Sequence, residues 1–202
     1  MTQEKRQYPR TLNCDDAKIE IALMTAADRE AVVGFVKTLS EDDLLFLSRD
    51  ISHPKVIDAW MRSIDEGRLV SLIARHDGVV IGCTTTFVDT LGWSRHVGEL
   101  RVLVSPAWRG RGLGRLLIQE CFAHSLDLGL RKLIARMTLA QHRAIGVFEE
   151  LGFRAEAMLS RHVADRNGVL HDLVMMSHDV DAVSNRQAAY GVHESLGESA
   201  ER

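Results

Sequence analysis

Seven stretches of the chain carry the alternating or continuous apolar pattern that predicts β-strands. They are 18–24, 69–75, 79–88, 97–104, 133–137, 157–164 and 169–177. Asp77-Gly78 separates the second stretch from the third, and Asn167-Gly168 lies between the sixth and the seventh. Because such dipeptides readily adopt the left-handed backbone of a tight turn, each of these two pairs is predicted to form an antiparallel hairpin.

Segments with helical spacing of apolar positions fill the longer gaps between these strands. The predicted helices are one from Thr25 towards Lys37, short segments within 39–60, one from Leu113 to about Gly129, and one over 141–151. Thr25 is the candidate N-cap of the first helix, and Gly129 is typical of the residue that follows a helix end. The predicted order is therefore β-α-α-β-β-β-α-β-α-β-β, an α/β fold.

Length and composition fit one domain with short extensions. The chain has 202 residues, of which 46% are hydrophobic and 26% charged, enough to bury one core. We expect this domain to span 18–178, after a polar, flexible leader over 1–17 and before a C-terminal tail over 179–202. The formal charge of −3 offers no general attraction for nucleic acid or an anionic membrane, and no segment reaches membrane-spanning length.

The three cysteines, Cys14, Cys83 and Cys121, are odd in number, far apart and outside any C-x-x-C motif. This usage indicates reduced thiols in a cytoplasmic protein and argues against a disulfide framework or a zinc site. We therefore expect no metal ion, no nucleic acid and no membrane among the partners of the chain.

The strongest functional signal is the stretch from Val102 to Arg115, V-L-V-S-P-A-W-R-G-R-G-L-G-R. A predicted strand, a glycine loop and a helix N-terminus follow one another here. The N–H groups and the positive dipole end of such a helix attract an anion, and glycines let the ligand approach the backbone. Arg109, Arg111 and Arg115 add positive charge that suits phosphate.

Spacing within the loop distinguishes between phosphate-binding motifs. The P-loop pattern G-x-x-x-x-G-K-[ST] fails at Gly110, because Arg115 stands where its second glycine belongs. The dinucleotide fingerprint G-x-G-x-x-G fails because arginine or leucine stands at its third glycine. The pattern [QR]-x-x-G-x-[GA] is met by Arg109, Gly112 and Gly114, although an ordinary strand-to-helix turn with solubilising arginines is the plainer alternative. On this motif the chain resembles the GNAT superfamily of N-acetyltransferases.

The resemblance covers about 18–178 and includes A-x-x-x-F-x-x-x-G-F from Ala144 to Phe153, close to the family's A-x-x-x-Y-x-x-x-G-F. It implies a GNAT fold, a mixed and mostly antiparallel sheet flanked by helices and splayed between its fourth and fifth strands. It also implies acetyl-CoA as co-substrate, without a metal. The residues that it assigns to acetyl-CoA are Val102, Leu103, Val104, Arg109, Gly110, Arg111, Gly112, Leu113, Gly114, Arg115, Gln141 and Phe148.

The resemblance also implies two catalytic roles. A bulge in strand 97–104 would free the backbone N–H of Val104 to stabilise the oxyanion of acetyl transfer. Glu99 would act as general base, often through water, because a lysine-like amine is almost fully protonated at pH 7. A solvated residue at a strand start is the plainer interpretation of Glu99, and His96 is a weaker candidate for the base.

Two positions depart from the family pattern. Phe148 replaces the tyrosine that many members use as general acid, so it is expected to pack in the core or beside the pantetheine arm. The thiolate would then leave without an acid, which its pKa permits. Gln141 stands where an asparagine often contacts the pantetheine arm, but it could equally cap a helix.

The sequence says least about the acceptor of the acetyl group. Leu39-Ser40-x-x-x-Leu44-x-Phe46 faintly resembles a segment of bacterial protein-lysine acetyltransferases, and Glu41, Asp42 and Asp43 would attract a cationic amine or cap a helix. We therefore predict an N-acetyltransferase that acts on a primary amine, with a protein lysine as one candidate acceptor. The rivals are a catalytically silent acyl-CoA sensor and an interaction module for another phosphate ligand. The oligomeric state, a homodimer included, stays open.

Overall fold

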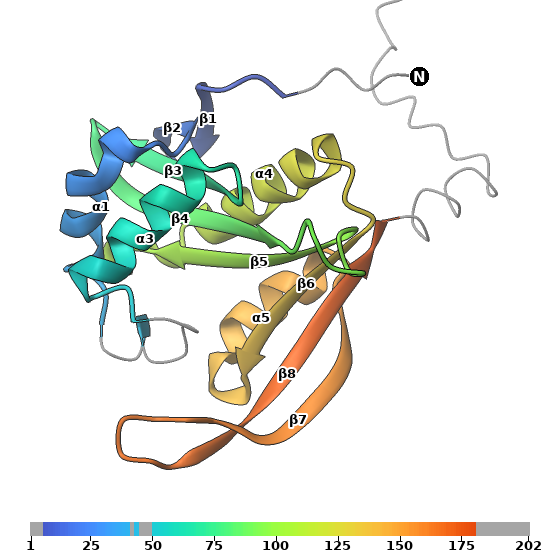
Figure 1. Ribbon diagram of the computed structural model, residues 1–202. Coiled ribbons are helices and arrows are strands. Elements are labelled where there is room, and N and C mark those ends of the chain that lie inside the picture. The colour runs from blue at the N-terminus through green and yellow to red at the C-terminus, as the bar shows by residue number, and fades with distance from the viewer. Residues whose placement is uncertain (1–5, 41–42, 45–49, 181–202) are drawn as a thin grey trace, which may run out of the picture.

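A computed structural model describes residues 6–40, 43–44 and 50–180, which form one mixed sheet of eight strands with helices on both faces (Figure 1). The strand order is β1-β2-β3-β4-β5-β6-β8-β7. The strands are β1 (Arg10–Cys14), β2 (Ala17–Leu23), β3 (Leu69–His76), β4 (Val79–Val88), β5 (Val97–Val104), β6 (Lys132–Thr138), β7 (Arg154–Ala164) and β8 (Leu170–Asp179). The helices are α1 (Arg29–Val36), α3 (Pro54–Asp65), α4 (Leu113–Asp127) and α5 (His142–Glu150), with short 3-10 turns at Ala26–Asp28, Pro106–Trp108 and Leu139–Gln141.

All seven strands expected from the apolar pattern are present, and the α/β fold is confirmed. β5 has the predicted bounds. Asp77 and Gly78 adopt positive φ angles of 49° and 78°, the backbone that the turn between β3 and β4 requires. The first helical segment begins after Thr25, whose side chain forms a reciprocal capping box with Asp28.

The N-terminal strand differs from expectation. Residues 10–14, which we placed in a flexible leader, form β1 and pair antiparallel with β2. The Tyr8 hydroxyl and the Arg10 guanidinium both donate to the buried carboxylate of Glu120 on α4, at 3.2 and 3.4 Å, and Arg6 pairs with the same group. Glu120 lies more than a hundred residues away from these side chains along the chain, so no local sequence pattern predicts the contacts.

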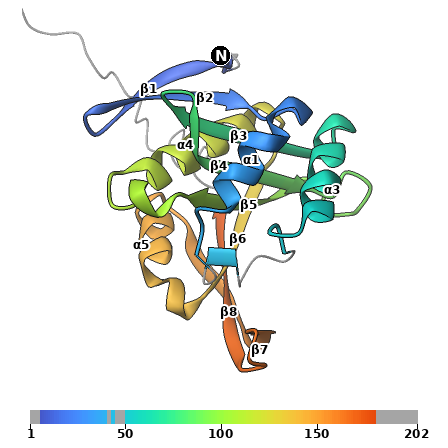
Figure 2. The ribbon, with the colours of Figure 1, turned by 90° about the vertical axis from the view of Figure 1, so that its left-hand side faces the viewer.

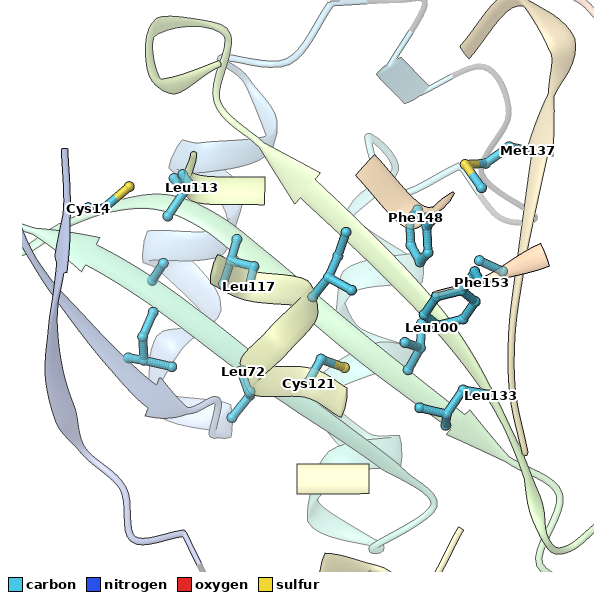
Figure 3. Close-up of a cluster of buried hydrophobic side chains, with 14 of the residues drawn as sticks. Cys14, Leu72, Leu100, Leu113, Leu117, Cys121, Leu133, Met137, Phe148 and Phe153 are labelled. Atoms are coloured by element: carbon cyan, nitrogen blue, oxygen red, sulfur yellow. The ribbon is translucent and has the colours of Figure 1, made fainter. Parts of the chain in front are cut away.

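Two buried clusters lie on opposite faces of the sheet. On one face Leu117 of α4 and Phe148 of α5 pack with Leu100 of β5 (Figure 3). On the other face lie α1, with Phe35, and α3, and Figure 2 shows these two helices across the sheet from α4 and α5. Leu103 of β5 packs against this second cluster. Because strand side chains alternate, odd-numbered side chains of β5 face α1 and α3.

The sheet opens between β5 and β6. These two strands run parallel and pair only over Val97–Glu99 and Lys132–Ile134. Beyond Glu99, β5 continues beside β4, whereas β6 continues beside β8. The fork corresponds to the gap expected between the fourth and fifth predicted strands, and the prediction of a splayed sheet is confirmed.

Further expectations concern the cysteines, membrane-spanning segments and the C-terminal tail. Cys14, Cys83 and Cys121 are all free and buried. No helix among the described residues is long and apolar enough to cross a membrane. Of the predicted tail, residues 181–202 lie outside the described part of the chain, as do 41–42 and 45–49 of the predicted acceptor region.

Candidate active site

The last part of β5 directs into the fork backbone groups that pair with no other strand among the described residues. Ser105 donates its N–H to the carbonyl of Ile81 at 2.9 Å, continuing the antiparallel ladder of β4 and β5. In such a ladder the next residue pair directs its N–H and C=O groups away from the partner strand. Val104 and, two residues earlier, Val102 therefore point these groups towards the β6 side, where described strand pairing ends at Glu99.

This orientation arises without a bulge in β5. The pairs between β4 and β5 run without a shift from Val88 and Gly98 to Gly82 and Val104. The nearby irregularity lies between β3 and β4, at Ala74/Arg75. The bulge expected from the family resemblance is therefore wrong for this chain. Strand alternation and the departure of β6 expose the Val104 N–H instead.

The glycine loop presents a helix N-terminus at the same end of β5. Gly112 is the N-cap of α4, with φ 85°, and Leu116 donates the first helical hydrogen bond to its carbonyl at 3.0 Å. The N–H groups over 113–115 therefore have no partner inside the helix. A Cβ atom at Gly110 or Gly112 would meet no atom within 4 Å. The open backbone and free N–H groups fit a pyrophosphate.

Each arginine of the loop already has a carboxylate partner on another element. The pairs are Arg109 with Asp43 (2.6 Å), Arg111 with Asp16 (2.7 Å) and Arg115 with Glu150 (2.5 Å). Arg111 also lies over the ring of Trp108, with its guanidinium carbon 4.4 Å from the ring centre. Much of the positive charge of the loop is thus compensated, so the backbone must supply part of any phosphate binding.

Glu99 lies where β5 and β6 part. Its side chain is only 10% exposed, and it accepts hydrogen bonds from Arg101, at 2.9 Å to Nη2, and from Arg136 of β6. Burial alone would raise the pKa of the Glu99 carboxyl, but the two arginines outweigh it and hold this pKa below its ordinary value. Glu99 is therefore a charged carboxylate at neutral pH.

Sequence reasoning missed the two arginines beside Glu99. Arg101 could have been found, because residues two apart on a strand share a face. Arg136 could not, because its place depends on the pairing of β6 with β5. The two guanidinium groups against one carboxylate leave one surplus positive charge on the α1 and α3 side of the fork.

Three other predicted site residues pack in the core, cap a turn or lie away from the glycine loop. Phe148 is 5% exposed and packs edge-on against Phe153, with ring centres 4.9 Å apart. The Gln141 side chain accepts the N–H of Thr138 at 3.0 Å, so it caps the turn before α5. His96 lines a shallow hollow of about 230 Å³ at the opposite end of β5 from the glycine loop.

Two leucines of the predicted acetyl-CoA site lie in the two cores. Leu113 is fully buried against the α4 and α5 side, and Leu103 packs on the side of α1 and α3. Their side chains are committed to packing, so any contact that they make with acetyl-CoA would involve their backbone atoms.

Substitution of Phe148 by leucine is expected to cost more in stability than in chemistry. The change removes ring contacts from a buried helix position, so the free energy of unfolding should fall by about 1 kcal/mol or somewhat more. Turnover, measured where the variant remains folded, should stay within about tenfold of wild type. A much larger loss of turnover at unchanged stability would show that the ring positions the thioester.

Comparison with known proteins adds relatives of similar length. The chain is 27% identical over 125 residues to the L-amino acid N-acyltransferase MnaT of Escherichia coli (strain K12), covering 61% of this chain and 72% of that protein. It is 24% identical over 155 residues to "Putative phosphinothricin acetyltransferase YwnH" of Bacillus subtilis (strain 168), covering 76% of this chain and 94% of that protein.

Solved structures share the fold. An acetyltransferase of the GNAT family from Streptococcus pneumoniae superposes with a TM-score of 0.70 at 20% identity, covering 80% of this chain and 99% of that chain. The protein yncA from Salmonella typhimurium, solved with its cofactor acetyl-CoA, gives 0.70 at 20% identity and covers 90% of this chain and 99% of that chain.

The family model described as "Acetyltransferase (GNAT) family" matches residues 35–153, which include β5, the glycine loop and α5. This span is more than half of the 202 residues, and it contains β5, β6 and the glycine loop described above. The chain belongs to the GNAT family and is an acetyl-CoA-dependent N-acetyltransferase.

Proposed function

We propose that the acceptor is a small molecule that carries a primary amine together with an acidic group. The observation behind this proposal is the cluster of Glu99, Arg101 and Arg136 at the fork. The arginine side chains remain 32% and 40% exposed, so both can contact a ligand. A partly buried surplus of positive charge attracts a carboxylate or phosphinate and repels a second cation.

The names of the relatives support the same class of acceptor. One is an L-amino acid N-acyltransferase, and another is named for phosphinothricin, so both names denote an acceptor with an acidic group. A protein lysine is the second candidate, suggested by the acidic run at 41–43. A lysine-rich surface would have to approach Arg101 and Arg136, which disfavours it.

In the proposed reaction the acetyl carbonyl accepts a hydrogen bond from the Val104 N–H. The backbone of Val102 pairs with the pantetheine arm, and the loop over 109–115 holds the pyrophosphate. Glu99 receives the amine proton through water. Five residues of extended strand separate the backbone of Glu99 from that of Val104 by roughly 16 Å, so the proposal routes the proton through water.

A paired acceptor screen tests the proposed substrate class. Free L-amino acids should be acetylated at least about tenfold more efficiently than the corresponding amides, because the amides keep the amine and lose the carboxylate. Release of free CoA from acetyl-CoA is the measurement, and Arg136→Gln should reduce this preference.

Lysine peptides form the third arm of the screen. Faster turnover of these peptides than of amino acids would contradict the proposal and favour a protein acceptor. Acetyl-CoA binding without CoA release in any arm would favour the silent acyl-CoA sensor.

A further inference from the structure

Arg109 joins the end of β5 to the segment between α1 and α3 through one nitrogen atom. Its Nη2 donates to the Val104 carbonyl at 3.3 Å and pairs with Oδ2 of Asp43 at 2.6 Å. Asp43 belongs to the segment between α1 and α3, and its Oδ2 also accepts the Ser40 N–H at 2.8 Å. A residue of the predicted acetyl-CoA motif thus holds a carboxylate of the segment between α1 and α3 beside the end of β5.

This bridge limits how far Asp43 can lie from the reacting groups. The two hydrogen bonds of Nη2, 3.3 Å and 2.6 Å long, keep the Asp43 oxygen within about 6 Å of the Val104 carbonyl oxygen. The carbonyl and the N–H of Val104 point to the same side of β5. Asp43 therefore lies beside the proposed oxyanion donor, whereas the backbone of Glu99 is roughly 16 Å back along the strand.

We propose that Asp43 binds the ammonium group of the acceptor after acetyl-CoA has drawn Arg109 to its pyrophosphate. This inference rests on the proposed function, because it assigns the amine of that acceptor to a specific carboxylate. Asp43 would then hold the amine beside the thioester.

The exchange of partners follows from charge and exposure. The Arg109 side chain is 47% exposed, and a pyrophosphate offers it a bidentate, more highly charged partner than one carboxylate oxygen. Once Arg109 leaves, Asp43, only 18% exposed, loses its counter-ion. A partly buried carboxylate without a cation is unfavourable, so the site recruits the ammonium group. Acetyl-CoA should therefore bind before the acceptor.

The other two loop arginines provide a contrast. The carboxylate partner of Arg111 is Asp16, in the turn between β1 and β2, and that of Arg115 is Glu150, at the end of α5. Arg115 and Glu150 are 47% and 65% exposed. In the described part of the chain, neither Arg111 nor Arg115 donates to a backbone group of β5. Among the described carboxylates, Asp43 is therefore the one that shares its loop arginine with the backbone at the end of β5.

Substitution of Asp43 by asparagine tests the inference. Calorimetry should show acetyl-CoA binding about threefold tighter or more, because Arg109 no longer has a competing partner. The KM for the acceptor should rise about tenfold or more, while kcat stays within about threefold. Asparagine still caps at Ser40, so the fold should be retained, and Asp43→Glu should recover part of the acceptor KM.

Glu150→Gln is the charge-matched control, because it also removes one carboxylate from a loop arginine. It should leave the KM for the acceptor within about twofold of wild type. An unchanged acceptor KM in Asp43→Asn, or weaker acetyl-CoA binding, would overturn the inference. Absence of turnover with every amine would contradict the proposed function. The calorimetric measurement needs no acceptor, so it tests the exchange of Arg109 between Asp43 and the pyrophosphate separately.

Discussion

Replacement of Gly112 by glutamate is expected to reduce acetyl-CoA affinity by about a hundredfold or more in a chain that still folds. The new side chain would enter open space, since no atom lies within 4 Å of a Cβ atom at this position. Its carboxylate would be tolerated at the positive end of α4. It would, however, occupy and repel the site proposed for the pyrophosphate. Calorimetric titration with acetyl-CoA measures the loss.

Gly112→Ala is the matched control for the backbone. With φ at 85°, any L-residue at this position costs roughly 1–2 kcal/mol, so both variants should lose similar stability. The alanine variant lacks the charge and should bind acetyl-CoA within about tenfold of wild type. If the folded glutamate variant bound as tightly as the alanine variant, the pyrophosphate would have to lie elsewhere.

The features that could be predicted from the sequence are those encoded locally. The apolar pattern predicted β5 with its observed bounds, because an apolar, β-branched run ends at Ser105-Pro106. The turn at Asp77-Gly78 and the capping box at Thr25 likewise depend on neighbouring residues only. The glycine loop also depends on neighbouring residues only, because the spacing of its glycines and arginines excludes the P-loop and dinucleotide-binding motifs.

The features that could not be predicted depend on contacts between distant residues. β1 is stabilised by pairing with β2 and by the contact of Tyr8 with Glu120, 112 positions away along the chain. The carboxylate of Asp43 and the guanidinium of Arg109, 66 positions apart along the chain, meet only because the tertiary fold brings the segment between α1 and α3 to the end of β5. A single sequence identifies such residue types but not their partners.

Glu99→Gln is expected to lower turnover by about a hundredfold or more while leaving acetyl-CoA affinity nearly unchanged. Glutamine keeps the shape and accepts hydrogen bonds from Arg101 and Arg136, but it cannot receive a proton. Because these arginines hold the pKa of Glu99 below its ordinary value despite burial, the carboxylate stays charged at neutral pH. A rise of kcat/KM with pH from neutrality upward should therefore follow deprotonation of the amine.

Comparison with Arg136→Gln separates proton transfer from a structural role. That variant removes one counter-ion from Glu99, so the pKa of the carboxyl should rise towards its ordinary value. If Glu99 receives the amine proton, Arg136→Gln should retain much more turnover than Glu99→Gln once the acceptor is saturating. Equal losses in the two variants would mean that Glu99 acts only by holding the arginines. Wild-type turnover and an unchanged pH profile in Glu99→Gln would instead show that the proton passes directly to solvent.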